Sequence, residues 1–344
     1  MQRALALARR GAGQTSPNPV VGAVVARNRR IIGEGFHRRA GGPHAEVNAL
    51  NGINGRGATL YVTLEPCCTH GRTPPCTEAI IAAGIKRVVV AAVDPNPRHR
   101  GRGLRLLRRA GLRVEAGLLA EEATELNAAF NKWITTGRPL VLAKAALSLD
   151  GKMATRTGDS RWITGTAART VAHRLRAQVD AVLVGANTVI RDDPQLTLRH
   201  GVRGRQPWRV VVDGRGRCPR TARLFTDALR QRTIVITSAQ SLVAWRRYLA
   251  LLGIIVLVVP ATHGRVELRA ALEELGRMEI TSVMVEGGGT LLGAFFDAGL
   301  VDRMAFFFAP TVIAGGATMD DARRVRGAWR RIGADEILFE GSLI

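Results

Sequence analysis

His44, Glu46, Cys67 and Cys76 have the types and the order of residues that build a hydrolytic zinc site. One imidazole and two thiolates can hold zinc while a fourth position stays open for water, whose pKa the metal lowers. Glu46 stands two residues after the histidine. A carboxylate placed there can carry the proton of the water to a leaving group without binding the metal itself. We therefore expect His44, Cys67 and Cys76 as metal ligands and Glu46 as the catalytic residue.

The spacing of these residues is typical of zinc deaminases, in which His-x-Glu is followed by Pro-Cys and a second cysteine. The general pattern places two residues between the cysteines, whereas eight separate Cys67 from Cys76. Cys68 and His70 are therefore competing ligands. We favour Cys76 because it alone begins a predicted helix.

The local sequence predicts the elements that hold this site. Residues 41–43 (Gly-Gly-Pro) break the chain before a helix that starts at Ala45 and runs to Leu50. The apolar run 60–64 predicts a buried strand, which Pro66 ends because proline lacks a backbone donor. A second helix is expected from Cys76 through Ala83. Both helix N-termini would favour thiolates over thiols.

Length and composition indicate a two-domain enzyme. A chain of 344 residues is too long for one typical core. The sequence has neither eighteen consecutive apolar residues nor a signal peptide, so we expect no membrane partner. Three of the four cysteines are crowded together, which suits a metal site in a reducing compartment. These features predict a cytoplasmic protein.

The formal net charge of +22 raises the possibility of a nucleic-acid partner. Only four of the fifty basic residues are lysines, and the arginines are spread over both halves of the chain. Aromatic residues, which would stack on bases, make up only 5%. We attribute the charge mainly to compositional bias and expect nucleic acid not to be a partner.

Strands and helices alternate along both halves, which predicts α/β domains. In the first half, the last predicted helix covers residues 121–134. Residues 135–139 (Thr-Thr-Gly-Arg-Pro) give the best domain boundary, so we predict domains at 1–137 and 138–344. The second half has predicted strands at the ranges 140–147, 181–185, 209–213, 233–237, 254–259 and 282–286.

The first half resembles the riboflavin-pathway pyrimidine deaminases. The resemblance rests on the segments 17–22 (PNPVVG), 64–67 (LEPC), 71–76 (GRTPPC) and 94–97 (DPNP). It implies a cytidine-deaminase-like three-layer sandwich, with Asn18 and Arg72 contacting the substrate. For Asn18, an Asx turn before a proline is an alternative interpretation.

The second half resembles the riboflavin reductase domain, which has a dihydrofolate-reductase-like α/β fold and uses NADPH. The resemblance rests on the segments 144–152 (KAALSLDGK), 160–164 (SRWIT), 192–197 (DDPQLT) and 285–288 (VEGG). Glycines at 287–289 suit the approach of a phosphate to a helix N-terminus, although a tight turn explains them equally well. Gly214 replaces the serine that is usual after the strand aspartate, so a side-chain contact is lost there.

This resemblance implies two sets of contacts in the second half. Cofactor contacts are expected at Ala146, Trp162, Thr188, Asp192, Gly214, Gly288, Gly289, Thr290, Leu291, Leu292, Gly293 and Ala294. Contacts to the ribosyl phosphate are expected at Ser160, Arg176, Leu196, Arg199 and Glu286.

Together these features predict a bifunctional enzyme of riboflavin biosynthesis that uses zinc and NADPH. It would deaminate a phosphorylated diamino-pyrimidine and then reduce the ribosyl group to ribityl. A homo-oligomer is expected. The alternative is a zinc deaminase that edits nucleic-acid bases, which would need a basic channel and stacking aromatics around the pocket.

Overall fold

The computed structural model describes residues 1–70, 74–154, 165–309, 325–332 and 336–343. The chain divides into two compact units, residues 1–137 and 138–344. These are the same ranges as the two domains that the sequence predicts. Among the described residues, no helix combines the length and the apolar character needed to cross a membrane.

A five-stranded sheet forms the centre of the first unit. Its strands are β1 (Gly22–Arg27), β2 (Arg30–Phe36), β3 (Thr59–Leu64), β4 (Arg87–Ala92) and β5 (Arg113–Ala116). They lie in the order β2-β1-β3-β4-β5. β1 pairs antiparallel with β2 and β3, whereas β3, β4 and β5 are parallel. The β1–β2 turn uses two left-handed residues, Asn28 and Arg29, as tight hairpins prefer.

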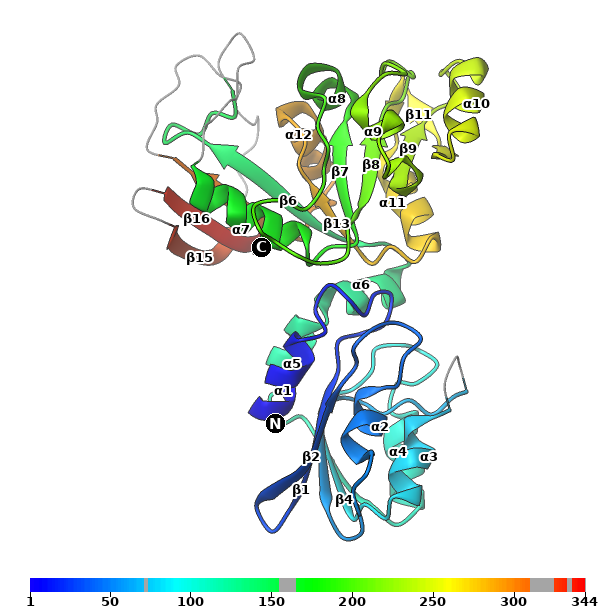
Figure 1. The fold of residues 1–344 in the computed structure, drawn as a ribbon, viewed down its shortest axis with the longest axis vertical. Helices are drawn as coiled ribbons and strands as arrows, with labels where there is room; N and C mark the ends of the chain where they lie inside the picture. Colours follow the sequence, from blue (N-terminus) through cyan, green and yellow to red (C-terminus); the bar gives the residue numbers. More distant parts are fainter. Residues whose placement is uncertain (71–73, 155–164, 310–324, 333–335, 344) are drawn as a thin grey trace. The chain divides into compact units, whose positions relative to one another are not determined.

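Helices cover both faces of this sheet (Figure 1). α2 (Ala45–Leu50), α3 (Cys76–Ala82) and α4 (Arg102–Arg109) pack on one face around a shared apolar core. α1 (Gln2–Arg9) and α5 (Ala120–Leu126) pack on the other face. The unit is therefore a three-layer sandwich, as predicted.

The predicted single helix over residues 121–134 is wrong. The structure has α5 and then a separate helix α6 (Ala128–Thr136), with Asn127 between them. Asn127 is buried, and its side chain accepts the Val20 N–H at 2.8 Å and donates to the Val20 carbonyl at 3.0 Å. A buried amide must satisfy its polar groups, and this long-range pairing outweighs a continuous helix.

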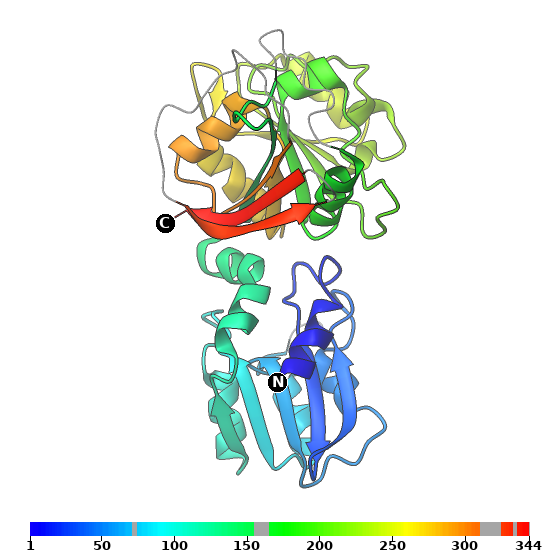
Figure 2. The ribbon, with the colours of Figure 1, turned by 90° about the vertical axis from the view of Figure 1, so that its left-hand side faces the viewer.

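A nine-stranded sheet forms the centre of the second unit (Figure 2). The strands are β6 (Leu140–Leu147), β7 (Ala181–Gly185), β8 (Trp208–Val212), β9 (Thr233–Thr237), β10 (Ile255–Val258), β13 (Ser282–Val285), β14 (Arg303–Phe308), β15 (Val325–Ile332) and β16 (Glu336–Leu343). Their order is β10-β9-β8-β7-β13-β6-β14-β16-β15. Neighbours from β10 to β14 are parallel, and β16 and β15 add an antiparallel hairpin. A small hairpin, β11 (Ala261–Thr262) with β12 (Arg265–Val266), stands apart.

Helices again cover both faces of the sheet. One face carries α7 (Thr166–Arg176), α8 (Ala186–Asp192), α9 (Arg223–Thr226) and α10 (Val243–Leu251). A short 3-10 helix, Arg230–Arg232, lies between α9 and α10 in the sequence. The opposite face carries α11 (Leu268–Arg277) and α12 (Gly289–Asp297). The carboxyl ends of β6, β7, β8 and β13 meet at one edge, where ligands of open parallel sheets bind.

The sequence did not predict the strands that follow Ala298. β14 is an apolar run that pairs in parallel with β6. β15 forms the edge of the sheet, and its sequence contains three arginines. Charged residues are typical of edge strands, and they hide the alternation that identifies a strand.

Candidate active sites

The first unit brings three predicted metal ligands together. One ligand atom from each of His44, Cys67 and Cys76 lies within 4.8 Å of the others. His44 Nδ1 is 3.2 Å from Cys76 Sγ and 3.5 Å from Cys67 Sγ. His44 is the N-cap of α2, and Cys76 is the first residue of α3. The strand–loop–helix geometry therefore places residues distant in sequence around one point.

The two cysteine side chains interact directly, and this contact moves their pKa values in opposite directions. The Cys76 thiol donates to Cys67, and this contact together with His44 lowers the pKa of the Cys67 thiol. The same contact and burial raise the pKa of the Cys76 thiol. Cys67 also accepts the Cys76 backbone N–H at 3.3 Å. An imidazole and two thiolates are donors that zinc prefers, and zinc binding would displace the remaining thiol proton, so the residue types and spacing of His44, Cys67 and Cys76 fit a zinc ion.

Glu46 lies in the first turn of α2 and is 3% exposed. Burial, followed by the charge of Cys67, raises the pKa of this carboxyl to about 7. A carboxyl with a pKa near neutrality can both accept and return a proton at physiological pH. Glu46 therefore has the environment of a general acid and base.

The competing ligands lie outside this cluster. Cys68 Sγ is 3.6 Å from His99 Nδ1, and His70 is exposed. Neither belongs to the group of metal-binding side chains found among the described residues.

Asn18 is connected to the metal cluster through His37, which the sequence did not single out. Asn18 Nδ2 lies 3.1 Å from His37 Nε2, and His37 Nδ1 lies 3.1 Å from the Pro43 carbonyl. Because a carbonyl only accepts, His37 carries its proton on Nδ1 and accepts the Asn18 amide on Nε2. The His37 ring packs edge-on against His44, with 5.2 Å between ring centroids. His37 therefore fixes the orientation of Asn18 beside the cluster.

The second unit places Glu286 directly after β13, where it pairs with two cations. Arg176 Nε and Nη2 lie 2.5 and 3.0 Å from its carboxylate oxygens, and Lys144 Nζ lies at 3.6 Å. Burial alone would raise the pKa of Glu286, but the charges of Arg176 and Lys144 prevail and lower it to about 2. Glu286 is therefore a fixed carboxylate. Most of the hydrogen-bonding capacity of Arg176 is used within the protein.

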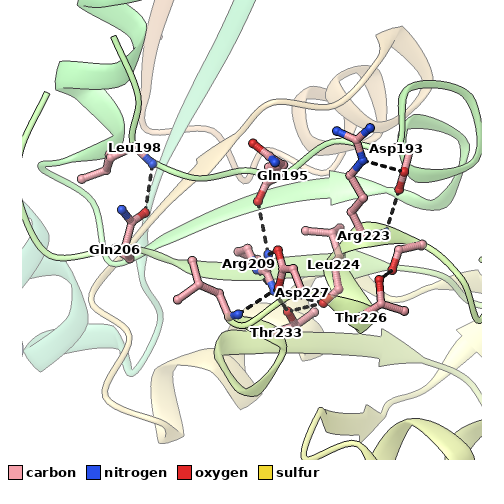
Figure 3. Close-up of polar contacts among 12 residues, drawn as sticks. Asp193, Gln195, Leu198, Gln206, Arg209, Arg223, Leu224, Thr226, Asp227 and Thr233 are labelled. Carbon is pink, nitrogen blue, oxygen red and sulfur yellow. Dashed lines mark hydrogen bonds and ion pairs between the residues drawn. The ribbon is translucent and has the colours of Figure 1, made fainter. Parts of the chain in front are cut away.

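The predicted substrate residues Leu196 and Arg199 lie on a loop that follows α8, which we call the 193–199 loop. Arg209, on β8, supports this loop from the core (Figure 3). Its side chain is 1% exposed and makes a two-point ion pair with Asp227 at 2.5 and 2.8 Å. The same guanidinium donates to the Gln195 carbonyl at 3.4 Å. A buried arginine thus satisfies its charge and anchors the loop.

Further hydrogen bonds hold the 193–199 loop along its length. They are Arg223 N to Asp193 Oδ1 at 2.8 Å, Arg176 Nη1 to the Thr197 carbonyl at 3.0 Å, Leu198 N to Gln206 Oε1 at 2.9 Å, and Arg199 N to His173 Nδ1 at 3.0 Å. Arg176 therefore contacts both Glu286 and this loop, so these predicted substrate residues form one connected group.

The predicted cofactor residues that the structure describes lie on segments at or after the carboxyl ends of strands in the same sheet. Gly288 is the N-cap of α12, and a Cβ added at Gly288 or Gly289 would meet no atom within 4 Å. The backbone there is open to a phosphate, which the N-terminus of a helix attracts. Thr188 and Asp192 lie on α8. Gly214 lies just after the end of β8, and Ala146 lies near the end of β6.

Gly214 has a packing reason that the sequence did not show. A Cβ at this position would lie 2.3 Å from the Gly264 carbonyl oxygen, in the turn between β11 and β12. No side chain fits against a backbone atom at that distance. The glycine therefore accompanies the close approach of the small hairpin to the end of β8.

The comparison with known proteins identifies the family. The family described as RibD C-terminal domain matches residues 139–331, and that described as cytidine and deoxycytidylate deaminase zinc-binding region matches residues 1–92. The riboflavin biosynthesis protein RibD of Aquifex aeolicus is 47% identical over 323 residues, covering 93% of this chain and 89% of that protein. The chain belongs to the RibD family.

Solved RibD structures have the same fold. Acinetobacter baumannii RibD matches with a TM-score of 0.89 and 40% identity, covering 100% of this chain and 97% of that one. A Thermotoga maritima diaminohydroxyphosphoribosylaminopyrimidine deaminase/5-amino-6-(5-phosphoribosylamino)uracil reductase matches with a TM-score of 0.87, 38% identity and the same coverage. The predicted fold class, a cytidine-deaminase-like sandwich followed by a dihydrofolate-reductase-like domain, is confirmed. The base-editing alternative is not favoured, because RibD similarity extends over both domains.

Three predicted contact residues of this RibD-family chain, Arg72, Ser160 and Trp162, lie outside the described residues.

Sequence reasoning assigned no role to Arg209. A signal was present, since Arg209 stands in the apolar strand sequence WRVVV. A charged residue inside a buried strand requires a partner, which the structure supplies in Asp227.

Proposed function

We propose that residues 1–137 of this RibD-family chain carry the deaminase and that residues 138–344 carry the reductase. The chain is a bifunctional enzyme of riboflavin biosynthesis that uses zinc and NADPH. The assignment of the deaminase rests chiefly on one observation, the His44, Cys67 and Cys76 cluster beside the buried Glu46. It accompanies a match to the zinc-binding deaminase region over the same residues.

In the deaminase, His44, Cys67 and Cys76 would hold the zinc ion. Zinc supplies Lewis acidity, which makes water nucleophilic near neutral pH. Glu46 takes a proton from the attacking water and delivers it to the departing amine, so that ammonia leaves and a carbonyl remains. Asn18, oriented by His37, contacts the pyrimidine ring.

In the reductase, NADPH would supply a hydride to C1′ of the ribosyl group, while the C1′–O4′ ring bond breaks and the released oxygen takes a proton from water, which gives the ribityl chain. Gly288, Gly289 and the start of α12 would hold its phosphates through backbone N–H groups. Glu286 contacts the sugar and is kept charged by Arg176 and Lys144. Arg199 is the guanidinium on the 193–199 loop that meets the substrate phosphate.

The substrate class we propose is a phosphorylated pyrimidine bearing a ribosylamine, as named for the Thermotoga maritima relative. We also propose a cytoplasmic location, because the free thiols at the zinc site need a reducing environment. A homo-oligomer is supported by the edge strand β15, where Trp329 is 63% exposed. Exposed edges with large apolar side chains favour association.

Two assays on the zinc-loaded full chain test the proposal. Ammonia release from the diamino-pyrimidine substrate reports the deaminase, and substrate-dependent NADPH oxidation with the deaminated compound reports the reductase. Activity in both supports the assignment. Ammonia release from single-stranded RNA, with none from the pyrimidine nucleotide, would favour the base-editing alternative.

A further inference from the structure

Helix α7 presents two side chains, one turn apart, to the 193–199 loop. Arg176 donates to the Thr197 carbonyl at 3.0 Å, and His173 Nδ1 accepts the backbone N–H of Arg199 at 3.0 Å. Residues three positions apart on a helix point to the same side. His173 is 5% exposed, so this contact is made within the protein.

The hydrogen bond from the Arg199 N–H determines which protonation state of His173 can make this contact. A ring nitrogen that accepts an N–H must be unprotonated, so the neutral ring carries its proton on Nε2. Burial, then the charges of Arg176, His200 and Arg199, lowers the pKa of His173 to about 4, against a smaller opposing effect of Glu286. These are the charged and titratable neighbours from α7, the loop and the end of β13. His173 therefore stays neutral and keeps its acceptor across the physiological range.

The backbone around Arg199 needs such a restraint. Leu196 and His200, on either side of it, are both non-glycine residues in the left-handed region, with φ of 52° and 56°. Such conformations persist when surrounding contacts over-determine them. The His173 ring also packs against the His200 ring, with 4.8 Å between centroids. His173 thus contacts both the backbone of Arg199 and the side chain of the residue that follows it.

The side chain of Arg199 has little other support. Its Nη1 donates to Gln195 Oε1 at 3.1 Å, within the same loop. Burial and the nearby charge of Arg176 lower the pKa of Arg199, as expected for a cation placed among like charges. A guanidinium in such a position is stabilised by an anion, and its direction depends on the backbone that carries it.

We propose that His173 is a positioning residue for the reductase, which orients Arg199 toward the substrate phosphate by accepting its backbone N–H on Nδ1. This inference rests on the proposed reductase function. His173 does not touch substrate, so its replacement acts on affinity for the phosphorylated ligand. The residues that take part in hydride transfer are not altered by this replacement, so the rate of that step should not change.

The test uses three variants of the full chain. In His173→Asn the amide oxygen takes the place of Nδ1, in His173→Gln it takes the place of Nε2, and His173→Leu removes both acceptors. We expect His173→Leu and His173→Gln to weaken binding of ribose 5-phosphate about five- to tenfold, the scale of one lost hydrogen bond, with His173→Asn close to wild type. The KM of the phosphorylated substrate should rise by the same factor, while kcat, the NADPH Kd and ammonia release stay unchanged. Equal loss in His173→Asn and His173→Leu, or a loss confined to kcat, would overturn the proposal.

A second measurement depends on neither catalysis nor variants. Imidazole ¹⁵N NMR of the wild-type chain should show His173 with an unprotonated Nδ1 and a protonated Nε2 from about pH 8 down to about pH 5.5. A proton on Nδ1, or titration near the ordinary histidine pKa, would refute the inference directly. If the wild type binds ribose 5-phosphate but does not oxidise NADPH, the proposed reductase function fails while these binding and NMR results still decide the role of His173.

Discussion

Replacing Glu286 by glutamine should destabilise the second unit strongly at neutral pH. The Glu286 side chain is 9% exposed and faces two cations, Arg176 at 11% and Lys144 at 18% exposure. Glutamine keeps the shape of the side chain and removes its charge. Both cations would then remain in a poorly solvated site without an anion, which is the costly way to break a buried pair.

The magnitude follows from the pKa of Glu286, which lies at about 2 compared with an ordinary value of 4.5. A difference of one unit between the folded and unfolded pKa corresponds to about 1.4 kcal/mol. The ionised carboxylate therefore stabilises the folded state by roughly 3 kcal/mol at neutral pH. For a domain of this size that corresponds to a fall in Tm of roughly 6–12 °C.

The pH dependence has a definite sign. The folded pKa of Glu286 is below the unfolded value, so its contribution is complete above about pH 4.5 and is lost as the pH falls toward about 2. The difference between wild type and Glu286→Gln should therefore shrink as the pH is lowered through this range. The wild type loses the stabilising charge there, whereas the variant has none to lose.

Calorimetry of the full chain can measure this effect, with the second unit assigned as the transition whose Tm NADPH raises. The matched control is Glu274→Gln, which removes an exposed carboxylate paired with Arg277 on α11. Exposed pairs contribute about 0–1 kcal/mol, so this control should shift Tm little. A Glu286→Gln variant as stable as the control at neutral pH would show that the charge contributes nothing to folding.

Three further predictions concern the metal, the proton transfer and the small hairpin. Cys76→Ser should lose zinc by metal analysis while Cys68→Ser keeps it, and the reverse result would overturn the ligand set. Glu46→Ala should abolish ammonia release yet retain zinc and NADPH oxidation with the deaminated substrate; loss of that oxidation would contradict separate sites. Gly214→Ser places a Cβ 2.3 Å from the Gly264 carbonyl and should cost about 1–3 kcal/mol by urea unfolding, whereas an unchanged midpoint would mean that the hairpin moves freely.

The parts of the structure that short motifs carry could be predicted from the sequence. His44 and Cys76 each begin a helix, and a strand leads to Cys67, so local signals alone placed the three ligands in order. Local propensity and function agree at these positions, which is why sequence reasoning succeeded there.

The parts that failed depend on contacts between distant residues. Nothing near Asn127 in the sequence shows that its amide will pair with the Val20 backbone and end a helix. The role of His37 depends on a loop that brings Pro43 back to it. The edge strand β15 could not be recognised from its own residues, because its pairing with β16 defines it.

Arg176 makes contacts within the protein that the sequence did not predict. The family resemblance implied that Arg176 contacts the ribosyl phosphate, and in the structure its nitrogens donate to Glu286 on one side and to the Thr197 carbonyl on the other. The Arg176 guanidinium binds the Glu286 carboxylate at the end of β13 and also binds the loop that carries Arg199. It therefore fixes the distance between Glu286 and this loop. The proposed sugar contact of Glu286 and the proposed phosphate contact of Arg199 would then both depend on the Arg176 side chain. We infer that Arg176 acts mainly by joining these two contacts, and that Arg199 supplies the charge that binds the phosphate.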